Sequence, residues 1–185
     1  MIYCSVFTKS NMLGIDKRIV QSENIDLSGA DIERITDGKC RIIAYEDLGG
    51  FLNIDQLLHP YDAAIILYQT KANYGHWVSI LRYDNHIEFF DPYGFGIDEE
   101  LEIVDHLHLR NQTPHLTHLI NNSNYKVIFN DKKLQKFSEH VNTCGRWCSL
   151  RVRFKDVPLK KFVELMTKNK YYDGDFWVSA LTILI

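Results

Sequence analysis

The sequence predicts an α+β domain with a central mixed, mainly antiparallel sheet flanked by helices. Three consecutive runs rich in Ile, Val, Phe and Tyr are typical of neighbouring strands, namely AAIILYQ (63–69), HWVSILRY (76–83) and HIEFFDPY (86–93). The turn dipeptide Asp84-Asn85 joins the last two runs. Helical patterns then occupy CGRWCSLRVRF (144–154) and LKKFVELMTK (159–168). In the second, apolar side chains recur on one face: Leu159, Phe162, Val163 and Met166.

The composition indicates one ordered domain that covers residues 1–185. Hydrophobic residues make up 45% of the chain and charged residues 24%, and no repeat or Pro/Gly/Ser-rich linker divides it. The net charge of -3 and the pI near 6.2 give no global basic field. Binding to a nucleic acid would therefore need a local basic patch.

The remaining elements are short. Residues 28–35 predict a helix that begins after Ser28 and carries Asp31 and Glu33 early. Further along, we expect a strand at 40–45, a turn at 47–50, a helical turn at 53–58 and a strand at 127–130.

The ends of the chain and its cysteines bear on its location. The N-terminus lacks a charged region followed by an apolar run, so no signal peptide is expected. The apolar segment 176–185 is far shorter than the roughly 20 residues that span a bilayer. We expect it to be a buried helix or strand, and no membrane association. Four cysteines are too few for a disulfide scaffold, which favours a reducing compartment.

The segment 142-NTCGRWC-148 holds the first candidate for chemistry. Cys144 falls where the helical pattern begins, after the capping pair Asn142-Thr143, so its sulfur would face the free N–H groups of the first turn. That environment favours the thiolate, the nucleophilic form. Cys148 lies one turn further into the helix, where no N–H groups are free, and we expect it to be a small buried hydrophobic side chain.

A thiolate needs a base, and His76 follows a glycine at the start of a strand. Asp91 ends the next strand, so the two side chains can meet at one edge of a hairpin and form a triad with the cysteine. Glu88 is the rival carboxylate, deeper in the strand, and a turn aspartate that caps its own backbone is the alternative for Asp91. A third glycine does not follow Gly94 and Gly96, which argues against a nucleotide-binding loop.

A zinc site is the competing interpretation of the same region. Four histidines cluster after the strands, and the two cysteines could supply thiolates; the histidines are His106, His108, His115 and His118. Neither the spacing of the cysteines nor that of the histidines matches a common zinc motif. We therefore expect no metal and no other cofactor, and a solvated polar face for the histidines.

The order of these motifs resembles the adenovirus maturation protease family and, more distantly, the proteases that process SUMO and other ubiquitin-like proteins. The motifs are GHW (75–77), FDPYGFG (90–96), Gln135 and TCGRWC (143–148), and the resemblance spans residues 40–154. It implies a source in a virus, a virophage or a polinton-like element. It also implies a papain-like cysteine protease with its nucleophile at a helix N-terminus.

Carried over to this chain, the resemblance implies that Cys144 is the nucleophile, His76 the general base and Asp91 the acidic member. It implies that Gln135 donates to the oxyanion, together with the backbone N–H of Cys144. Trp77, next to the base, resembles a tryptophan of the family whose ring could shield or stack on the imidazole.

Three departures from the family pattern matter. Gln135 precedes Cys144 by nine residues, a longer interval than is usual, so Gln112 and Asn130 stay open as substitutes. The acidic residue is an aspartate, as in SUMO proteases, where adenoviral enzymes have glutamate. No cysteine lies between Cys40 and Cys144 to tether an activating peptide through a disulfide, and the acidic pI argues against stimulation by DNA.

The expected function is that of a cysteine endopeptidase that cleaves viral capsid or core precursor proteins during virion maturation, in the virion, the host cytoplasm or a virus factory. An activating peptide stays open as a partner. The resemblance implies cleavage next to glycine, because both branches of these proteases prefer it. Aromatic residues near the proposed site agree with this, since a narrow slot lined by their rings would exclude bulky side chains; these residues are Trp77, Tyr93, Phe95 and Trp147. The alternatives are an isopeptidase for a ubiquitin-like protein and a non-catalytic zinc or protein-binding module.

Overall fold

The computed structural model describes residues 9–103 and 113–183. Its helices and strands follow one another along the chain as follows: α1 (Lys9–Glu23), α2 (Gly29–Thr36), β1 (Arg41–Ala44), the 3-10 helix η1 (Tyr45–Gly50), α3 (Ile54–Leu58), β2 (Ala63–Lys71), β3 (Tyr74–Arg82), β4 (His86–Phe90), α4 (Glu100–Ile103), α5 (His115–Asn121), β5 (Lys126–Phe129), α6 (Cys144–Arg153), α7 (Leu159–Thr167) and α8 (Gly174–Ile183).

The strands form one mixed sheet in the order β1-β2-β3-β4-β5. The pairs β2–β3 and β3–β4 are antiparallel, as predicted from the three apolar runs, and the outer strands β1 and β5 each pair in parallel with their neighbour. Parallel pairs need crossover connections, and here η1 and α3 connect β1 to β2, while α4 and α5 lie between β4 and β5. The α+β class and the mixed sheet are confirmed.

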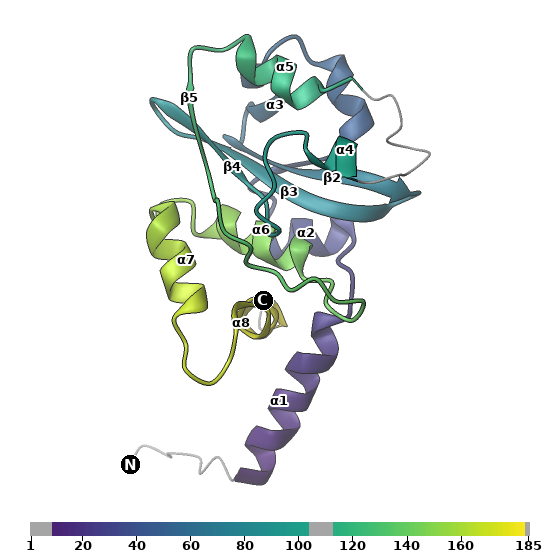
Figure 1. The fold of residues 1–185 in the computed structure, drawn as a ribbon, viewed down its shortest axis with the longest axis vertical. Helices are drawn as coiled ribbons and strands as arrows, with labels where there is room; N and C mark the ends of the chain where they lie inside the picture. The colour runs from purple at the N-terminus through teal and green to yellow at the C-terminus, as the bar shows by residue number, and fades with distance from the viewer. Residues whose placement is uncertain (1–8, 104–112, 184–185) are drawn as a thin grey trace.

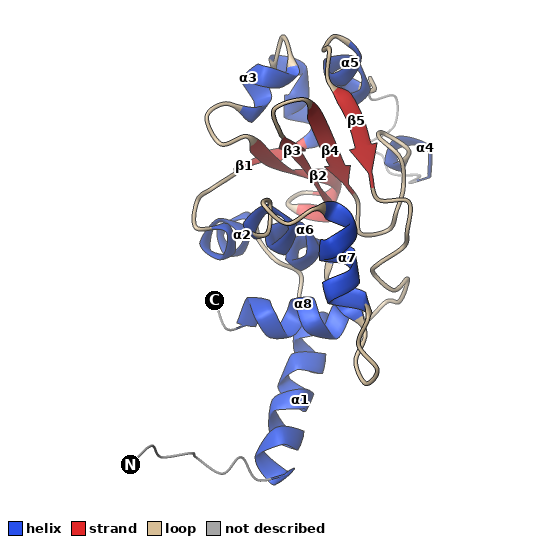
Figure 2. Cartoon of the chain, turned by 90° about the vertical axis from the view of Figure 1, so that its left-hand side faces the viewer, coloured by secondary structure: helices blue, strands red, loops and turns tan. Residues whose placement is uncertain are grey.

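Helices cover both faces of this sheet (Figures 1 and 2). Successive side chains of a strand point to opposite faces. In β3, Trp77 and Leu81 therefore join the core beneath α2, α6, α7 and α8, while Val78 and Ile80 join the core beneath α3 and α5. One sheet thus separates two apolar cores, and α6 is the helix that packs directly on β3.

The predicted helices are present. Ser28 caps α2 through a reciprocal capping box with Asp31, and Phe162 and Met166 are the buried side chains of α7. The C-terminal apolar segment is the helix α8, and no helix in the described part of the chain is long and apolar enough to cross a membrane. Helix α1 was not predicted; it packs on α8 and extends away from the sheet (Figure 1).

A buried ion pair fixes α6 against β4. Arg151 donates from Nε to Glu88 Oε1 at 2.5 Å and from Nη2 to Oε2 at 2.9 Å, and both side chains are at most 1% exposed. Removing one partner of such a pair costs about 3–5 kcal/mol, because the other charge is left buried alone. The rival carboxylate Glu88 is therefore engaged in holding the helix in place.

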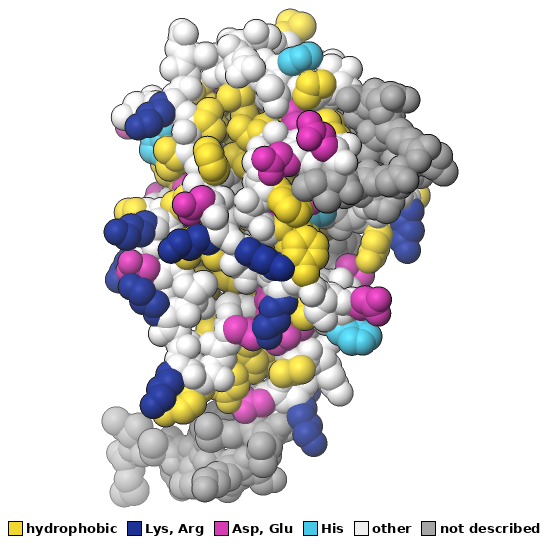
Figure 3. Space-filling model, viewed as in Figure 1, with side chains coloured by type: hydrophobic (Ala, Val, Ile, Leu, Met, Phe, Trp, Pro, Cys, Tyr) yellow, Lys and Arg dark blue, Asp and Glu magenta, His cyan; other side chains and the backbone are white. Residues whose placement is uncertain are grey.

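The surface carries charges of both signs. On the face in Figure 3, Lys and Arg side chains lie among Asp and Glu, with hydrophobic side chains between them. This mixture agrees with the small net charge of -3.

Candidate active site

A cleft of about 300 Å³ lies where the first residues of β3 and of α6 meet. The turn after β4 and the loop before α6 complete its walls. Its lining residues are Asp26, Thr70, Tyr74, Gly75, His76, Tyr93, Phe95, Glu100, Gln135, Phe137, Asn142 and Cys144. Three of the four predicted catalytic side chains line this cleft, and the fourth, Asp91, is buried behind His76.

His76 and Asp91 form a direct hydrogen bond. Nε2 of the imidazole lies 2.8 Å from Oδ1 of the carboxylate, and both side chains are buried. Since Nε2 is bound to Asp91, Nδ1 is the ring nitrogen that is left for the Cys144 sulfur. The hairpin therefore brings together the two residues that its sequence predicted would meet.

The turn after β4 holds the Asp91 carboxylate in place. Oδ1 also accepts from the Tyr93 backbone N–H at 2.7 Å, and the Gly94 N–H donates to the Asp91 carbonyl at 2.9 Å. Gly94 has a φ of +78, and a Cβ there would lie 2.9 Å from the Lys132 backbone, so only glycine fits. Asn130 donates to the Asp91 carbonyl at 2.6 Å and accepts from its N–H at 3.0 Å.

Electrostatics favour the charged form of the imidazole. Burial alone would lower the pKa of His76, but the Asp91 carboxylate, its hydrogen bond and the neighbouring Cys144 sulfur together raise this pKa well above its ordinary value. An imidazolium at neutral pH is the partner that a thiolate requires.

Cys144 is the first residue of α6 and is 8% exposed. Thr143 occupies the N-cap position, but no side chain caps this end of the helix. The N–H groups of the first turn therefore lack the side-chain acceptor that a capping residue would supply.

Cys148 lies in a different environment. Its thiol is fully buried and donates to the Trp77 carbonyl at 3.2 Å. Burial raises the pKa of Cys148 well above the usual thiol value, and the nearby Cys144 and Asp91 raise it further. This sulfur therefore stays protonated, whereas Cys144 opens onto the cleft.

Gln135 lies across the cleft and is 1% exposed. Its Nε2 donates to the Tyr93 hydroxyl at 3.1 Å and to the Val141 carbonyl at 2.9 Å. A carbonyl can only accept a hydrogen bond, so the second contact fixes which amide atom is the nitrogen. The Gln135 backbone N–H donates to the Pro92 carbonyl at 2.9 Å, which ties this loop to the turn after Asp91.

The two substitutes considered for Gln135 are placed differently. Asn130 is engaged with the Asp91 backbone, as described above. Gln112 lies outside the described residues.

The aromatic residues divide into two groups. The Tyr93 ring stacks on His76 with centroids 4.5 Å apart, and Phe137 stacks on its other face at 4.2 Å. Tyr93 and Phe95 line the cleft as expected, whereas Trp77 and Trp147 are not among its lining residues. Trp77 donates to the Leu27 carbonyl, and Trp147 is fully buried beside Asp175.

Three further residues in the cleft were missed by sequence reasoning. Glu100 lies 3.7 Å from His76 Nε2, and burial raises its pKa, with His76 opposing this shift and Asp91 adding to it. Tyr74 and Phe137 are exposed aromatic side chains at the rim. An acidic run shortly after the FDPYGFG motif ends at Glu100, and this run could have indicated a further carboxylate near the site.

The cysteines and histidines of the competing zinc interpretation do not form a cluster of metal ligands in the part of the chain that the structure describes. There, the one group of potential metal ligands consists of His76, Asp91 and Glu100, and it includes neither cysteine. His115 lies instead beside the Tyr45 ring. His106 and His108 lie outside the described residues.

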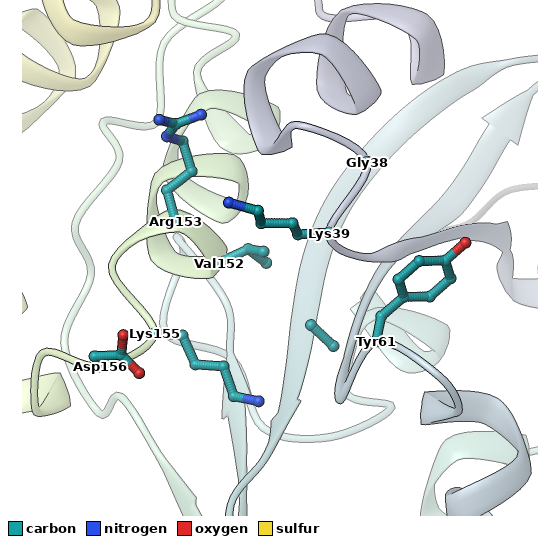
Figure 4. A pocket seen from close by; sticks show the side chains of 8 residues that line it. Gly38, Lys39, Tyr61, Val152, Arg153, Lys155 and Asp156 are labelled. Carbon is teal, nitrogen blue, oxygen red and sulfur yellow. The ribbon is translucent and has the colours of Figure 1, made fainter.

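A larger pocket of about 540 Å³ lies at the other end of α6 (Figure 4). Lys39, Arg153 and Lys155 surround it, with Tyr61 on the opposite side. Val152 is eight residues beyond Cys144, so at 1.5 Å per residue this pocket is about 12 Å along the helix from the cleft. No cysteine or histidine lines it.

The fold is similar to that of a solved viral protein. The structure resembles that of the pS273R protease of ASFV, with a TM-score of 0.50 and 14% identity over 88% of this chain and 68% of that one. A second structure of the same protease gives the same TM-score at 12% identity. At these identities the likeness concerns the fold alone.

At the level of sequence, the chain is 37% identical over 175 residues to "Uncharacterized protein V9" of Sputnik virophage, covering 90% of this chain and 99% of that protein. It belongs to the same family as this virophage protein. No protein-family model matches the sequence.

The electrostatics of the pair give a pH-dependent prediction. In Asp91→Asn, the pKa of His76 should fall, because a neutral amide no longer attracts the imidazolium. NMR titration of the His76 ring in both proteins measures this change.

The same pKa shift affects stability. A raised histidine pKa contributes stability that is fully present below about pH 6.5 and is lost as the pH rises through the pKa of His76 in the folded protein. The difference in unfolding free energy between wild type and Asp91→Asn should therefore narrow toward alkaline pH. Identical His76 titrations would contradict the pairing.

Proposed function

We propose that the protein is a cysteine endopeptidase in which Cys144, His76 and Asp91 act as a triad. One observation carries the proposal: a cysteine at an uncapped helix start shares a cleft with a histidine whose far nitrogen lies 2.8 Å from a buried carboxylate. The fold, which resembles that of a viral protease, supports it.

The chemistry follows from the two ring nitrogens of His76. The Cys144 thiolate attacks the scissile carbonyl carbon, a C–S bond forms, and the carbonyl electron pair moves onto oxygen. The imidazolium gives its Nδ1 proton to the amide nitrogen as the C–N bond breaks. The neutral imidazole then takes a proton from water, whose oxygen attacks the thioester, and the C–S bond breaks. Asp91 holds the ring throughout and stabilises its charged form.

The oxyanion needs donors that are in place before it forms. We assign this role to the Cys144 backbone N–H and to Nε2 of Gln135. In the resting cleft, both hydrogens of that amide are taken up, by the Tyr93 hydroxyl and the Val141 carbonyl. Burial raises the pKa of Tyr93, so its hydroxyl stays neutral. It can therefore hydrogen-bond the Gln135 amide without placing a negative charge beside the oxyanion. The oxyanion would replace one of these two acceptors.

The substrates proposed are capsid or core precursor proteins, cleaved next to glycine during particle maturation. The relationship to a virophage protein and the fold of a viral protease support the viral role. The rings of Tyr74, Phe95 and Phe137 border the cleft and would restrict the side chain at the scissile bond. Trp77 and Trp147 contribute to the packing behind the site rather than to this slot.

The first test separates the two cysteines of α6. Cys144→Ala should abolish peptide cleavage, because it removes the nucleophile, while Cys148→Ala should retain most of it, since this buried thiol stays protonated. Cleavage is measured as the appearance of new N-termini in structural proteins of the same genome. A fusion to a ubiquitin-like protein is tested alongside them, and its preferential cleavage would indicate an isopeptidase. Equal losses in the two variants would show that the reaction does not depend on Cys144 as its nucleophile.

The second test concerns the oxyanion donors. Gln135→Ala should lower kcat by about 100-fold with little change in KM, as the loss of one donor does in other enzymes. Tyr93→Phe keeps the ring stacked between His76 and Phe137 and removes only the hydroxyl. We expect a loss in kcat of about 5-fold from this variant, the value of one neutral hydrogen bond. A Tyr93→Phe enzyme faster than wild type would mean that the hydroxyl blocks the oxyanion position.

A further inference from the structure

Asp175 is a buried carboxylate that the proposed reaction does not use. It is the second residue of α8 and is 1% exposed. α8 lies on the side of α6 that faces away from the sheet (Figures 1 and 2), so this carboxylate is outside the cleft. A charge so deeply buried needs several hydrogen bonds to offset its desolvation.

Its hydrogen bonds reach both sides of the oxyanion site. Oδ1 accepts from the Thr143 hydroxyl at 2.5 Å and from Trp147 Nε1 at 2.9 Å, while Oδ2 accepts from the Lys136 backbone N–H at 3.0 Å. Thr143 directly precedes Cys144, and Lys136 directly follows Gln135. One carboxylate therefore holds the neighbours of both proposed oxyanion donors, through charge-assisted hydrogen bonds.

The backbone of α8 is shaped for this close approach. A Cβ at Gly174 would lie 2.5 Å from Cζ2 and 2.6 Å from Cη2 of Trp147. That separation is shorter than real side chains allow, and the buried indole has no room to move. Glycine at this position thus lets the start of α8 reach the first turn of α6.

The bond to Thr143 also affects the end of α6 directly. A threonine at the N-cap position ordinarily accepts a hydrogen bond from an N–H of the first turn. Here its hydroxyl is turned to Asp175, and no side chain caps the helix. The same contact that holds Thr143, next to Cys144, therefore leaves the first-turn N–H groups without a side-chain acceptor.

We propose that Asp175 is a positioning residue that sets the spacing between the Cys144 N–H and the Gln135 amide. The proposal rests on the proposed function, because that spacing matters only if the two groups bind an oxyanion. Asp175 does not touch the reacting atoms, and it acts through Thr143 and Lys136.

The test is Asp175→Asn in the full chain. The amide keeps one oxygen acceptor but presents an NH2 group to one of the three donors, so at least one contact is lost. We expect kcat to fall about 10-fold, with KM within about twofold of wild type, since small displacements of catalytic groups are costly. The rate of Cys144 alkylation by iodoacetamide should stay within about twofold, because alkylation forms no oxyanion.

Two controls keep the test decisive. Asp173→Asn changes a neighbouring, more exposed carboxylate that pairs with the Lys136 side chain and accepts from the Phe176 backbone N–H, rather than from Thr143 or Trp147. This variant should leave kcat unchanged. If Asp175→Asn does not fold, Thr143→Val and Thr143→Ser test the same contact. The valine variant should have a lower kcat than wild type, and the serine variant, which keeps the hydroxyl, should have a kcat close to that of wild type.

An unchanged kcat per titrated Cys144 in Asp175→Asn, or equal kcat in the two Thr143 variants, would overturn the proposal while leaving the protease itself intact. Failure of the proposed function is a separate outcome, in which the wild-type protein neither cleaves peptides nor shows alkylation of Cys144 that depends on His76.

Discussion

The site depends on the close packing of the start of α6 against β3. A Cβ at Gly145 would lie 3.2 Å from Cδ1 of Trp77 and 3.2 Å from Cβ of Leu27, so the glycine lets the helix approach to the limit of contact. His76 directly precedes Trp77, and Cys144 directly precedes Gly145. The Gly145–Trp77 contact therefore also determines how close the thiol comes to the imidazole. A side chain at 145 would require Leu27 or Trp77 to shift by a few tenths of an ångström.

Burial and charge act against each other in this site. Dehydration disfavours an imidazolium, but the fixed carboxylate of Asp91 and the sulfur of Cys144 outweigh it and raise the pKa of His76. At Cys148 burial and charge act in the same direction, because burial and the nearby negative groups all raise the pKa of that thiol. Two cysteines one helical turn apart thus lie in different surroundings: Cys148 is fully enclosed, whereas Cys144 lines the cleft beside His76.

Local patterns predicted much of this molecule. The three apolar runs gave the antiparallel centre of the sheet, and the position of Asp91 after a strand end placed it beside His76. Contacts between distant segments were beyond such patterns. Trp77 and Trp147 are close in sequence to the site, yet α2, α7 and α8 cover them, so both belong to the core. Asp175 lies 31 residues after Cys144, and only the packing of α8 on α6 shows what it contacts.

In the proposed mechanism His76 makes Cys144 reactive, and the rate at which each cysteine is alkylated measures this effect. Each thiol is followed with iodoacetamide from about pH 5 to about pH 9, across the range of ordinary thiol reactivity, with peptide mass spectrometry to identify the modified residue. We expect Cys144 to react faster than Cys40 and Cys148, already on the acidic side of this range, and His76→Ala to abolish this difference in rate. A Cys144 that reacts only near alkaline pH, at the same rate with and without His76, would contradict it.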